Sequence, residues 1–272
     1  MKFTPRTSPH GKLPNTVTWQ MAQVLIALVP GIIALAWYFG YGVLINISIA
    51  TATAVLGEAM VLKLRHRDIR ATLADLSAVV TAVLLGMALP PLLPWWMTVC
   101  ATLFAIVFVK HMYGGLGYNP FNPAMAGYVL LLVSFPVSMT QWLAPSVLNE
   151  YPLAFSETLR VIFASELPTG LDWDAVTSAT PLDEMRNQLN QNKMISEIQA
   201  SPLWGDYGAR GWEWVANWLL LGGLFLLWRK VITWHIPLSM IAGMLMISGL
   251  FWLFDQETIP FPAFHLFSGG MM

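Results

Sequence analysis

The residues with the clearest chemical potential lie in one polar stretch, from Asp174 to Asp183, with the sequence DAVTSATPLD. Thr180 precedes Pro181, and a residue before proline is biased toward an extended backbone. Proline at a first helical position, followed by acidic residues such as Asp183 and Glu184, is typical of the first turn of a helix. We therefore expect Thr180 to be the N-cap of a short helix, with its hydroxyl projecting from the turn.

The Thr180 hydroxyl allows two interpretations that share one geometry. A capping hydroxyl satisfies free N–H groups at the start of a helix, and this is the purely structural interpretation. A helix N-terminus is also a favourable place for a phosphate, so the same hydroxyl could be the attachment point of a phosphorylated cofactor. Ser178 and Ala179 are small and leave room beside it.

A second unusual stretch, His111 to Tyr128, combines glycine, asparagine and proline in the sequence HMYGGLGYNPFNPAMAGY. Its glycines permit positive φ angles, and its prolines break a helix. Non-helical backbone at membrane depth is tolerated only where protein buries it or where it lines a cavity. One interpretation is a re-entry loop that begins a helix, with Asn122 as its N-cap. The other is that Gly115 to Asn122 lines a site for a flavin ring, a quinone or an ion.

Isolated polar residues in the apolar segments have structural explanations. Glu58 lies one turn from the basic end of its segment, so the preferred interpretation is that it reaches the membrane interface; the alternative is a bundle interior. Asp75 begins another segment, where the helix dipole favours a carboxylate. Trp234 and His235 are interpreted as an interfacial aromatic pair.

The chain that must position these residues is much more apolar than a soluble domain. Of its 272 residues 56% are hydrophobic and 11% are charged, whereas soluble domains have about 25% charged residues. The apolar residues form blocks of the length that a helix needs to cross a bilayer. They predict an all-α fold, a polytopic membrane helix bundle with seven spans: Trp19–Phe39, Val43–Leu62, Ser77–Leu93, Trp95–Val109, Ala124–Met139, Trp212–Trp228 and His235–Phe254.

Lys and Arg residues predict the orientation of these spans. Ten of the 14 lie on one side of a seven-span arrangement, Lys110 among them, and the positive-inside bias makes that side cytoplasmic. Residues 1–18 are then a cytoplasmic arm rather than a secretory signal, and residues 19–139 a bundle of five spans. Residues 140–211, with nine acidic residues, form one long periplasmic loop, and residues 212–254 supply two further spans. The predicted location is the inner membrane of a bacterium.

Other functional classes have little support. A net charge of −1 gives no indication of nucleic-acid binding. Cys100 alone can form neither an intrachain disulfide nor a metal site. The spacing of residues supports no hydrolase triad, zinc site or P-loop, so neither catalytic residues nor metal ligands are predicted.

The polar motif and its surroundings resemble the RnfD and NqrB family, membrane subunits of the Rnf (or Rsx) electron-transport complex and of the sodium-pumping quinone reductase. The short motif alone is weakly specific for this family. The motif together with the neighbouring sequence stretches, in this order, is strongly specific for it. The resemblance rests on Asp174-Ala-Val-Thr-Ser-Ala-Thr180 followed by Pro-Leu-Asp, and on LVPGIIALAWYFGYG, EAMVLKLR, ATLADLSAVVTAVLLGMALPPLLPWW, KHMYGGLGYNPFNPAMAGYVLLLVSFP, WHIPLS and FHLFSGG.

In that family the motif Asp-x-x-Ser/Thr-x-Ala-Thr carries FMN, which is joined through its phosphate to the last threonine. The resemblance therefore implies that Thr180 is the FMN phosphoryl threonine. Thr177, Ser178 and Ala179 are motif positions, and Asp174 is implied to be recognised by a flavin transferase. A second, non-covalently bound flavin, riboflavin or FMN, is left open.

The resemblance also implies the partners and the activity. The chain would be a translocase and oxidoreductase subunit, active only within a hetero-oligomer of about six Rnf subunits in membrane lipid, where it passes electrons coupled to Na⁺ or H⁺ translocation. Members of the family continue past FHLFSGG with roughly three more spans, about ten in all. Residues 255–272 are therefore expected to be a periplasmic end that is shortened relative to the family.

Two other functions are kept as alternatives. One is a secondary transporter of a small solute, whose broken-helix binding site would lie at Asn119 to Pro123. The other is a purely structural membrane scaffold. No inverted repeat is detectable in the sequence, which counts mildly against the transporter.

Overall fold

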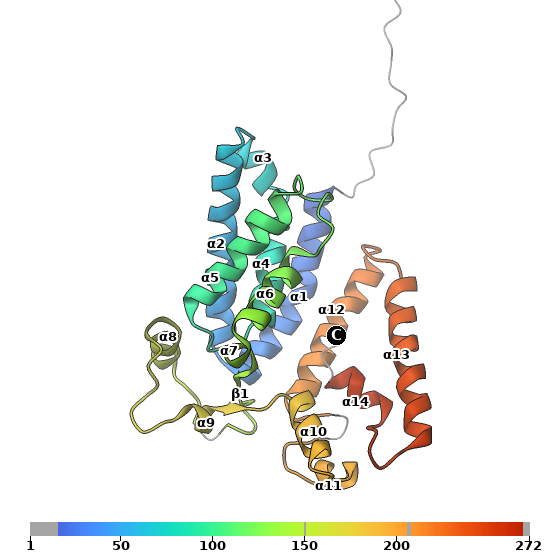
Figure 1. Ribbon diagram of the computed structural model, residues 1–272. Helices are drawn as coiled ribbons and strands as arrows, with labels where there is room; N and C mark the ends of the chain where they lie inside the picture. Colours follow the sequence, from blue (N-terminus) through green and yellow to red (C-terminus); the bar gives the residue numbers. More distant parts are fainter. Residues whose placement is uncertain (1–15, 150, 206–207, 269–272) are drawn as a thin grey trace, which may run out of the picture.

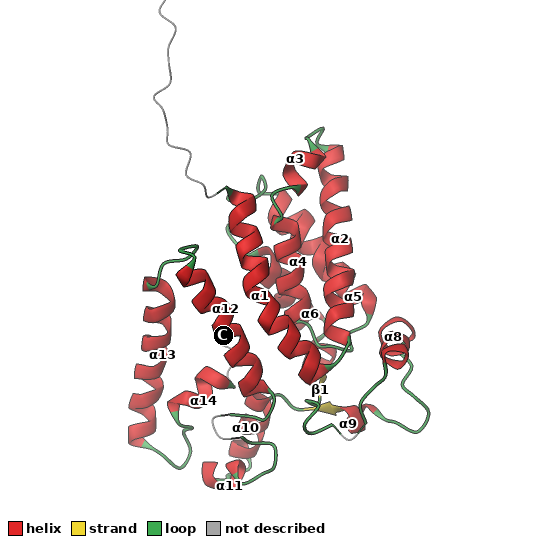
Figure 2. Cartoon of the chain, turned by 180° about the vertical axis from the view of Figure 1, so that it is seen from behind, coloured by secondary structure: helices red, strands yellow, loops and turns green. Residues whose placement is uncertain are grey.

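Helices form nearly all of the regular structure in the computed structural model, which describes residues 16–149, 151–205 and 208–268 (Figures 1 and 2). A two-stranded antiparallel sheet joins β1 to β2. The elements in chain order are α1 (Val17–Phe39), α2 (Gly42–Leu64), α3 (Ile69–Leu73), α4 (Ser77–Ala88), α5 (Trp95–Leu103), the π-helix η1 (Phe104–His111), α6 (Pro123–Ser134), α7 (Pro136–Thr140), β1 (Trp142–Leu143), α8 (Phe155–Ala164), α9 (Trp173–Val176), β2 (Thr177–Ser178), α10 (Pro181–Asn190), α11 (Ile195–Gln199), α12 (Trp212–Trp228), α13 (His235–Phe254) and α14 (Pro262–Phe267).

Each predicted span contains a helix, and the sixth and seventh have the predicted bounds. The first and second are longer by one or two residues at an end, and the third, fourth and fifth differ in other ways. The third ends at Ala88 instead of Leu93, because the prolines that follow cannot continue a helix. The fourth changes from α-helix to π-helix and reaches His111. The fifth ends at Ser134, and a separate short helix begins at Pro136.

Three of the described helices, α1, α2 and α13, are long and apolar enough to cross a membrane by length and composition. Shorter apolar helices lie at Ser77–Ala88, Trp95–His111 and Pro123–Ser134. The prediction of a helical membrane protein is therefore confirmed, while the number of crossings stays a prediction.

Small residues let the main helices approach one another closely. α2 packs against α4 and α5, and α1 packs against α12. A Cβ atom at Gly86 of α4 would lie 2.8 Å from the Cα of Ile47 in α2. A Cβ atom at Gly222 of α12 would overlap the carbonyl of Ala27 in α1. Such contacts are typical of membrane helices, where close packing of backbones drives association.

The two ends of this bundle differ in the segments they expose. The segment from α2 to α3 and the turn between α12 and α13 lie at one end, which is the upper end in Figure 1. These two segments contain Lys63, Arg65, Arg67, Arg70, Arg229 and Lys230. The described residues among 140–211, here called the polar segment, lie at the opposite end with β1, α8, α9, α10 and α11 (Figures 1 and 2). The basic and acidic parts of the chain are thus separated along the bundle axis.

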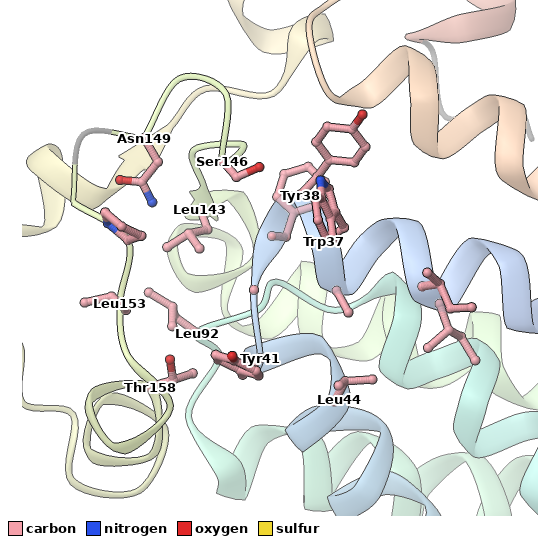
Figure 3. A pocket seen from close by; sticks show the side chains of 17 residues that line it. Trp37, Tyr38, Tyr41, Leu44, Leu92, Leu143, Ser146, Asn149, Leu153 and Thr158 are labelled. Carbon is pink, nitrogen blue, oxygen red and sulfur yellow. The ribbon is translucent and has the colours of Figure 1, made fainter.

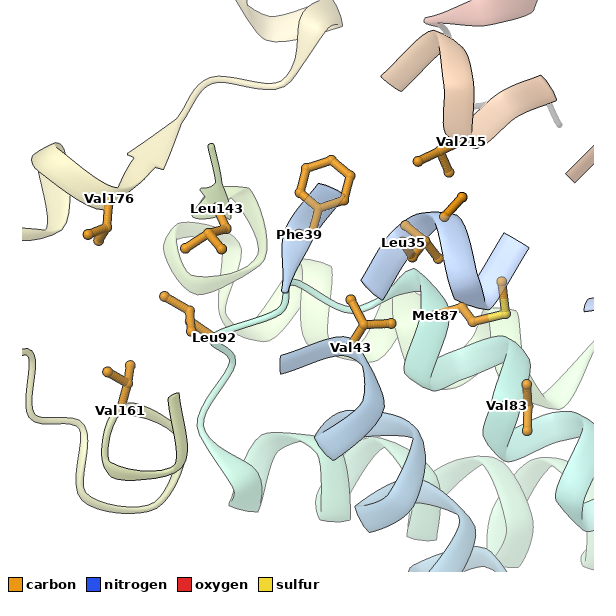
Figure 4. Packing of buried hydrophobic residues seen from close by; sticks show 11 residues of the cluster. Leu35, Phe39, Val43, Val83, Met87, Leu92, Leu143, Val161, Val176 and Val215 are labelled. Atoms are coloured by element: carbon orange, nitrogen blue, oxygen red, sulfur yellow. The ribbon is translucent and has the colours of Figure 1, made fainter. Parts of the chain in front are cut away.

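The polar segment is folded and packs on the end of the bundle. Leu143, Val161 and Val176 of this segment belong to the same buried cluster as Phe39 and Val43 of the bundle (Figure 4). Val176 is fully buried, with an exposed fraction of 0%. The predicted long loop is therefore an ordered layer in its described residues.

An aromatic cluster fixes the position of β1. The Phe39 ring lies 5.8 Å from the ring of Trp142 and 4.6 Å from that of Trp212, and the two tryptophan rings are 5.1 Å apart. These residues come from the end of α1, from β1 and from the start of α12. Aromatic pairs of this kind stabilise by about 1 kcal/mol each beyond burial of their area.

The last helix, α14, packs against both α12 and α13. α13 contacts α14 and has no buried residue, and α14 lies between α12 and α13 in Figure 1. A second small core joins Met185 of α10, Ile198 of α11 and Phe264 of α14. This core holds α10 beside α14.

We expect Gly222→Ala to destabilise the bundle by about 1–2 kcal/mol, because the added methyl group overpacks the contact between α12 and α1. Gly223 has no heavy atom within 4 Å of its would-be Cβ, so Gly223→Ala should be neutral or stabilising by up to about 1 kcal/mol through helix propensity. Thermal unfolding of the two variants in detergent measures the difference. Equal stabilities of the two variants would contradict the packing described for α12.

Candidate functional site

Thr180 lies where the sequence predicts it, as the N-cap of α10. Its backbone is extended, with φ −66° and ψ 154°. The N–H of Asp183 donates to Thr180 Oγ1 over 3.3 Å, and Thr180 Oγ1 donates to Asp183 Oδ2 over 2.7 Å. The capping interpretation is confirmed, with Pro181 at the first helical position.

Pairing with β1 holds the motif against the bundle. Ser178 pairs with Trp142, and Thr177 pairs with Leu143. One residue further along, the N–H of Ala144 donates to the carbonyl of Val176 over 3.1 Å. The aromatic cluster fixes the position of Trp142, and Trp142 pairs with Ser178. Thr180 therefore lies only two residues along the chain from a residue whose position is fixed.

The remaining motif residues are distributed around this point. Asp174 is exposed on the short helix α9. Thr177 and Ser178 are half-buried, and Thr177 Oγ1 donates to the carbonyl of Trp173 over 2.8 Å. Ala179 is exposed. Among the hydrogen bonds of the described residues, Asp174 has no contact with the Thr180 hydroxyl.

The surroundings of Thr180 fit a phosphoester. The side chain is half-buried, and its neighbour Ala179 is exposed and small, so the hydroxyl is open to a reaction partner. The start of α10 offers the positive end of a ten-residue helix, which favours an attached phosphate. Pro181 has no N–H, and the N–H groups of Asp183 and Glu184 already donate to Thr180.

A cavity of roughly 520 Å³ lies beside β1, the strand that pairs with the motif strand β2 (Figure 3). It is lined by Trp37 and Tyr38 at the end of α1, by Tyr41 of the turn to α2, and by Leu143 and Leu153 of the polar segment. Leu143 is the residue whose backbone pairs with Thr177. Its apolar and aromatic lining could hold a planar ring or an acyl chain.

A buried ionic cluster lies inside the bundle, away from the motif. Lys110 Nζ is 2.5 Å from Glu58 Oε1 and 2.7 Å from Ser77 Oγ, and His111 Nε2 is 3.0 Å from the same Glu58 oxygen. Glu58 has an exposed fraction of 0%, Lys110 2% and His111 3%. The expectation that Glu58 reaches the interface is therefore wrong, and so is the placement of Lys110 among the basic loop residues.

The π-helix explains why this cluster was not expected from the sequence. In η1 the wider turn brings Lys110 and His111 to the face that packs on α2, and π-helical turns are frequent at functional sites. One signal was available, because a carboxylate within an apolar helix requires a partner. Glu58 Oε2 and His111 Nδ1 have no hydrogen-bond partner within the described part of the chain, so either atom could accept or exchange a proton or contact a cation.

The glycine-rich stretch forms a turn that leads into α6. Gly114, Gly115 and Gly117 have φ angles of 115°, 106° and 86°, which suit glycine. Asn122 Oδ1 accepts from the N–H of Ala124 over 3.0 Å, which confirms Asn122 as the N-cap. Most side chains from residue 112 to 122 are exposed. A flavin, quinone or ion site along this backbone stays a prediction.

The cap at Asp75 is also confirmed, and Trp234 and His235 form the expected aromatic pair, whose place at the membrane interface stays a prediction. Asp75 Oδ1 accepts from the N–H and the hydroxyl of Ser77, over 2.7 and 2.5 Å, so it caps the start of α4. The rings of Trp234 and His235 stack with their centroids 4.1 Å apart at the start of α13.

Known proteins resemble this chain along its whole length. The chain is 44% identical over 280 residues to the D subunit of the ion-translocating oxidoreductase complex of Shigella dysenteriae serotype 1 (strain Sd197), covering 100% of this chain and 80% of that protein. The values are the same for the corresponding protein of Escherichia coli O127:H6, and the identity is 43% for that of Shigella boydii serotype 18. The model of the NQR2, RnfD, RnfE family matches residues 4–272. The chain therefore belongs to the NQR2, RnfD, RnfE family.

Proposed function

We propose that this chain is a membrane subunit of an ion-translocating oxidoreductase complex and that it carries FMN as a phosphoester of Thr180. The names of the relatives support the first part. The second part depends on one observation: the last threonine of the Asp-x-x-Thr-x-Ala-Thr motif presents its hydroxyl, half-buried, at the N-terminus of α10. The motif with its accessible hydroxyl would let a transferase recognise Thr180. The helix N-terminus would stabilise the attached phosphate.

When bound, FMN would supply the redox chemistry, accepting and giving up electrons. The residues of the chain set its place. Pairing of Thr177 with Leu143 holds the attachment point at the end of the bundle where the polar segment lies. The cavity beside Leu143 is the proposed place for a flavin ring, because its lining is mostly apolar and includes aromatic side chains.

The proposal includes an orientation and a set of partners. The basic end of the bundle faces the cytoplasm, in agreement with the positive-inside bias, and the polar segment faces the periplasm of a bacterial inner membrane. Asp174 is exposed on α9, where a flavin transferase can contact it. The other subunits of the complex surround the bundle within the lipid. A second, non-covalently bound flavin is also part of the proposal.

Coupling to Na⁺ or H⁺ would require a charged group inside the bundle, and Glu58 is the candidate. Its carboxylate is fully buried, and Oε2 has no hydrogen-bond partner within the described residues. A buried carboxylate beside a lysine and a histidine can change its charge state or exchange a partner. The alternative of a solute transporter would instead place the binding site at Asn119 to Pro123, where most side chains are exposed.

We expect the purified chain to have the mass of the polypeptide plus that of one FMN less water, because one hydroxyl is esterified. Thr180→Ala should remove this mass and the flavin fluorescence of the denatured polypeptide. Thr258 is the matched control, since Thr258 Oγ1 also donates to a carboxylate, that of Asp255, over 2.5 Å, but lies outside the motif. Peptide mapping that finds residues 174–183 unmodified in cells with an active transferase would disprove the attachment.

We expect Glu58→Gln to retain FMN and to reduce ion uptake by at least about tenfold in inverted vesicles supplied with reduced ferredoxin, since Glu58 is proposed to carry charge. The single variant leaves Lys110 buried without a counter-charge, which costs about 3–5 kcal/mol of stability. The double variant Glu58→Gln with Lys110→Met removes that cost. Normal ion uptake by the stable double variant would show that the pair is only structural.

A further inference from the structure

The Thr180 hydroxyl differs from the other threonine hydroxyl of the motif in the group that accepts its proton. Thr180 Oγ1 donates to a carboxylate oxygen, Asp183 Oδ2, over 2.7 Å. Thr177 Oγ1 donates to a backbone carbonyl, that of Trp173, over 2.8 Å. A carboxylate can take a proton from a reacting hydroxyl, whereas a backbone carbonyl cannot act as a base at neutral pH.

We propose that Asp183 is the general base that activates Thr180 during attachment of the flavin. This inference rests on the proposed function, because it concerns the esterification of Thr180. This chain is the substrate of the transferase, and it would thus supply a catalytic group for its own modification. The distance of 2.7 Å between Thr180 Oγ1 and Asp183 Oδ2 lies within the range for a general base and the proton that it abstracts.

The step balances with a flavin adenine dinucleotide as the co-reactant, bound by the transferase. Thr180 Oγ1 attacks the phosphorus next to the flavin ribityl chain while its proton passes to Asp183 Oδ2. The bond from Oγ1 to phosphorus forms, the phosphoanhydride bond breaks, and AMP leaves. Neither oxidation nor reduction takes place, and the proton on Asp183 finally passes to solvent.

The position of Asp183 in the helix supports this role. Residue three of the first turn reaches back toward the N-cap, so the carboxylate is held against the hydroxyl before the transferase binds. Glu184, the next acid of the same turn, is engaged instead by the side-chain amide of Gln188. Asp183, rather than Glu184, is therefore aligned with the reacting oxygen.

Titratable groups of the surrounding elements are Tyr128 of α6, which interacts electrostatically with Asp183, and Glu197 of α11 and His265 of α14.

The test is single-turnover transfer of FMN to the full-length chain, produced without a transferase and then mixed with purified transferase and flavin adenine dinucleotide. Intact mass follows the reaction. Asp183→Asn should slow transfer by about 100-fold, the usual contribution of a general base. Glu184→Gln is the matched control and should stay within a few-fold of the unaltered chain, and Asp183→Glu should recover most of the rate.

The pH dependence separates a base from a structural cap. Without a general base the hydroxyl must lose its proton to hydroxide, so the rate of Asp183→Asn should rise by about tenfold per pH unit relative to the unaltered chain between about pH 6 and pH 8. A rate ratio that does not change with pH, or equal rates at all pH values, would overturn the role of Asp183. Failure of the unaltered chain to gain any FMN would instead overturn the proposed function itself.

Discussion

The contact on which the rest of this structure depends is the aromatic cluster of Phe39, Trp142 and Trp212 at one end of the bundle. It joins the helices α1 and α12 to the strand β1, and β1 in turn pairs with the motif strand β2. Large aromatic side chains bury much area at low cost in conformational entropy. A segment of mostly polar sequence thereby acquires a fixed position relative to the membrane helices.

The two candidate centres occupy environments that suit different chemistry. Thr180 is half-buried at a helix N-terminus, where a macromolecular partner can reach it and a phosphate is stabilised. Glu58 and Lys110 are buried within the helices, where charges interact strongly because the effective dielectric constant is low. Breaking such a pair is costly, so any ion that enters must replace the interactions it disrupts. Electron transfer and ion movement would thus use separate parts of the chain.

Capping and reactivity at Thr180 follow from the same arrangement of atoms. The N-cap hydroxyl accepts one backbone N–H and donates to the carboxylate of Asp183. The first interaction starts the helix, and the second holds the hydroxyl proton on an oxygen that can accept it. The structural and functional interpretations of this residue therefore do not compete.

The sequence by itself determined the helical membrane character, the Thr180 and Asn122 caps and the family, because these depend on composition, local turn chemistry and motif order. The tertiary structure decided the partner of Glu58, since Lys110 lies 52 residues away in sequence and the π-helix that turns it inward has no local signature. It also decided that the polar segment packs on the bundle. That packing arises from Leu143, Val161 and Val176 meeting Phe39, and contacts between distant residues cannot be deduced from periodicity within either segment.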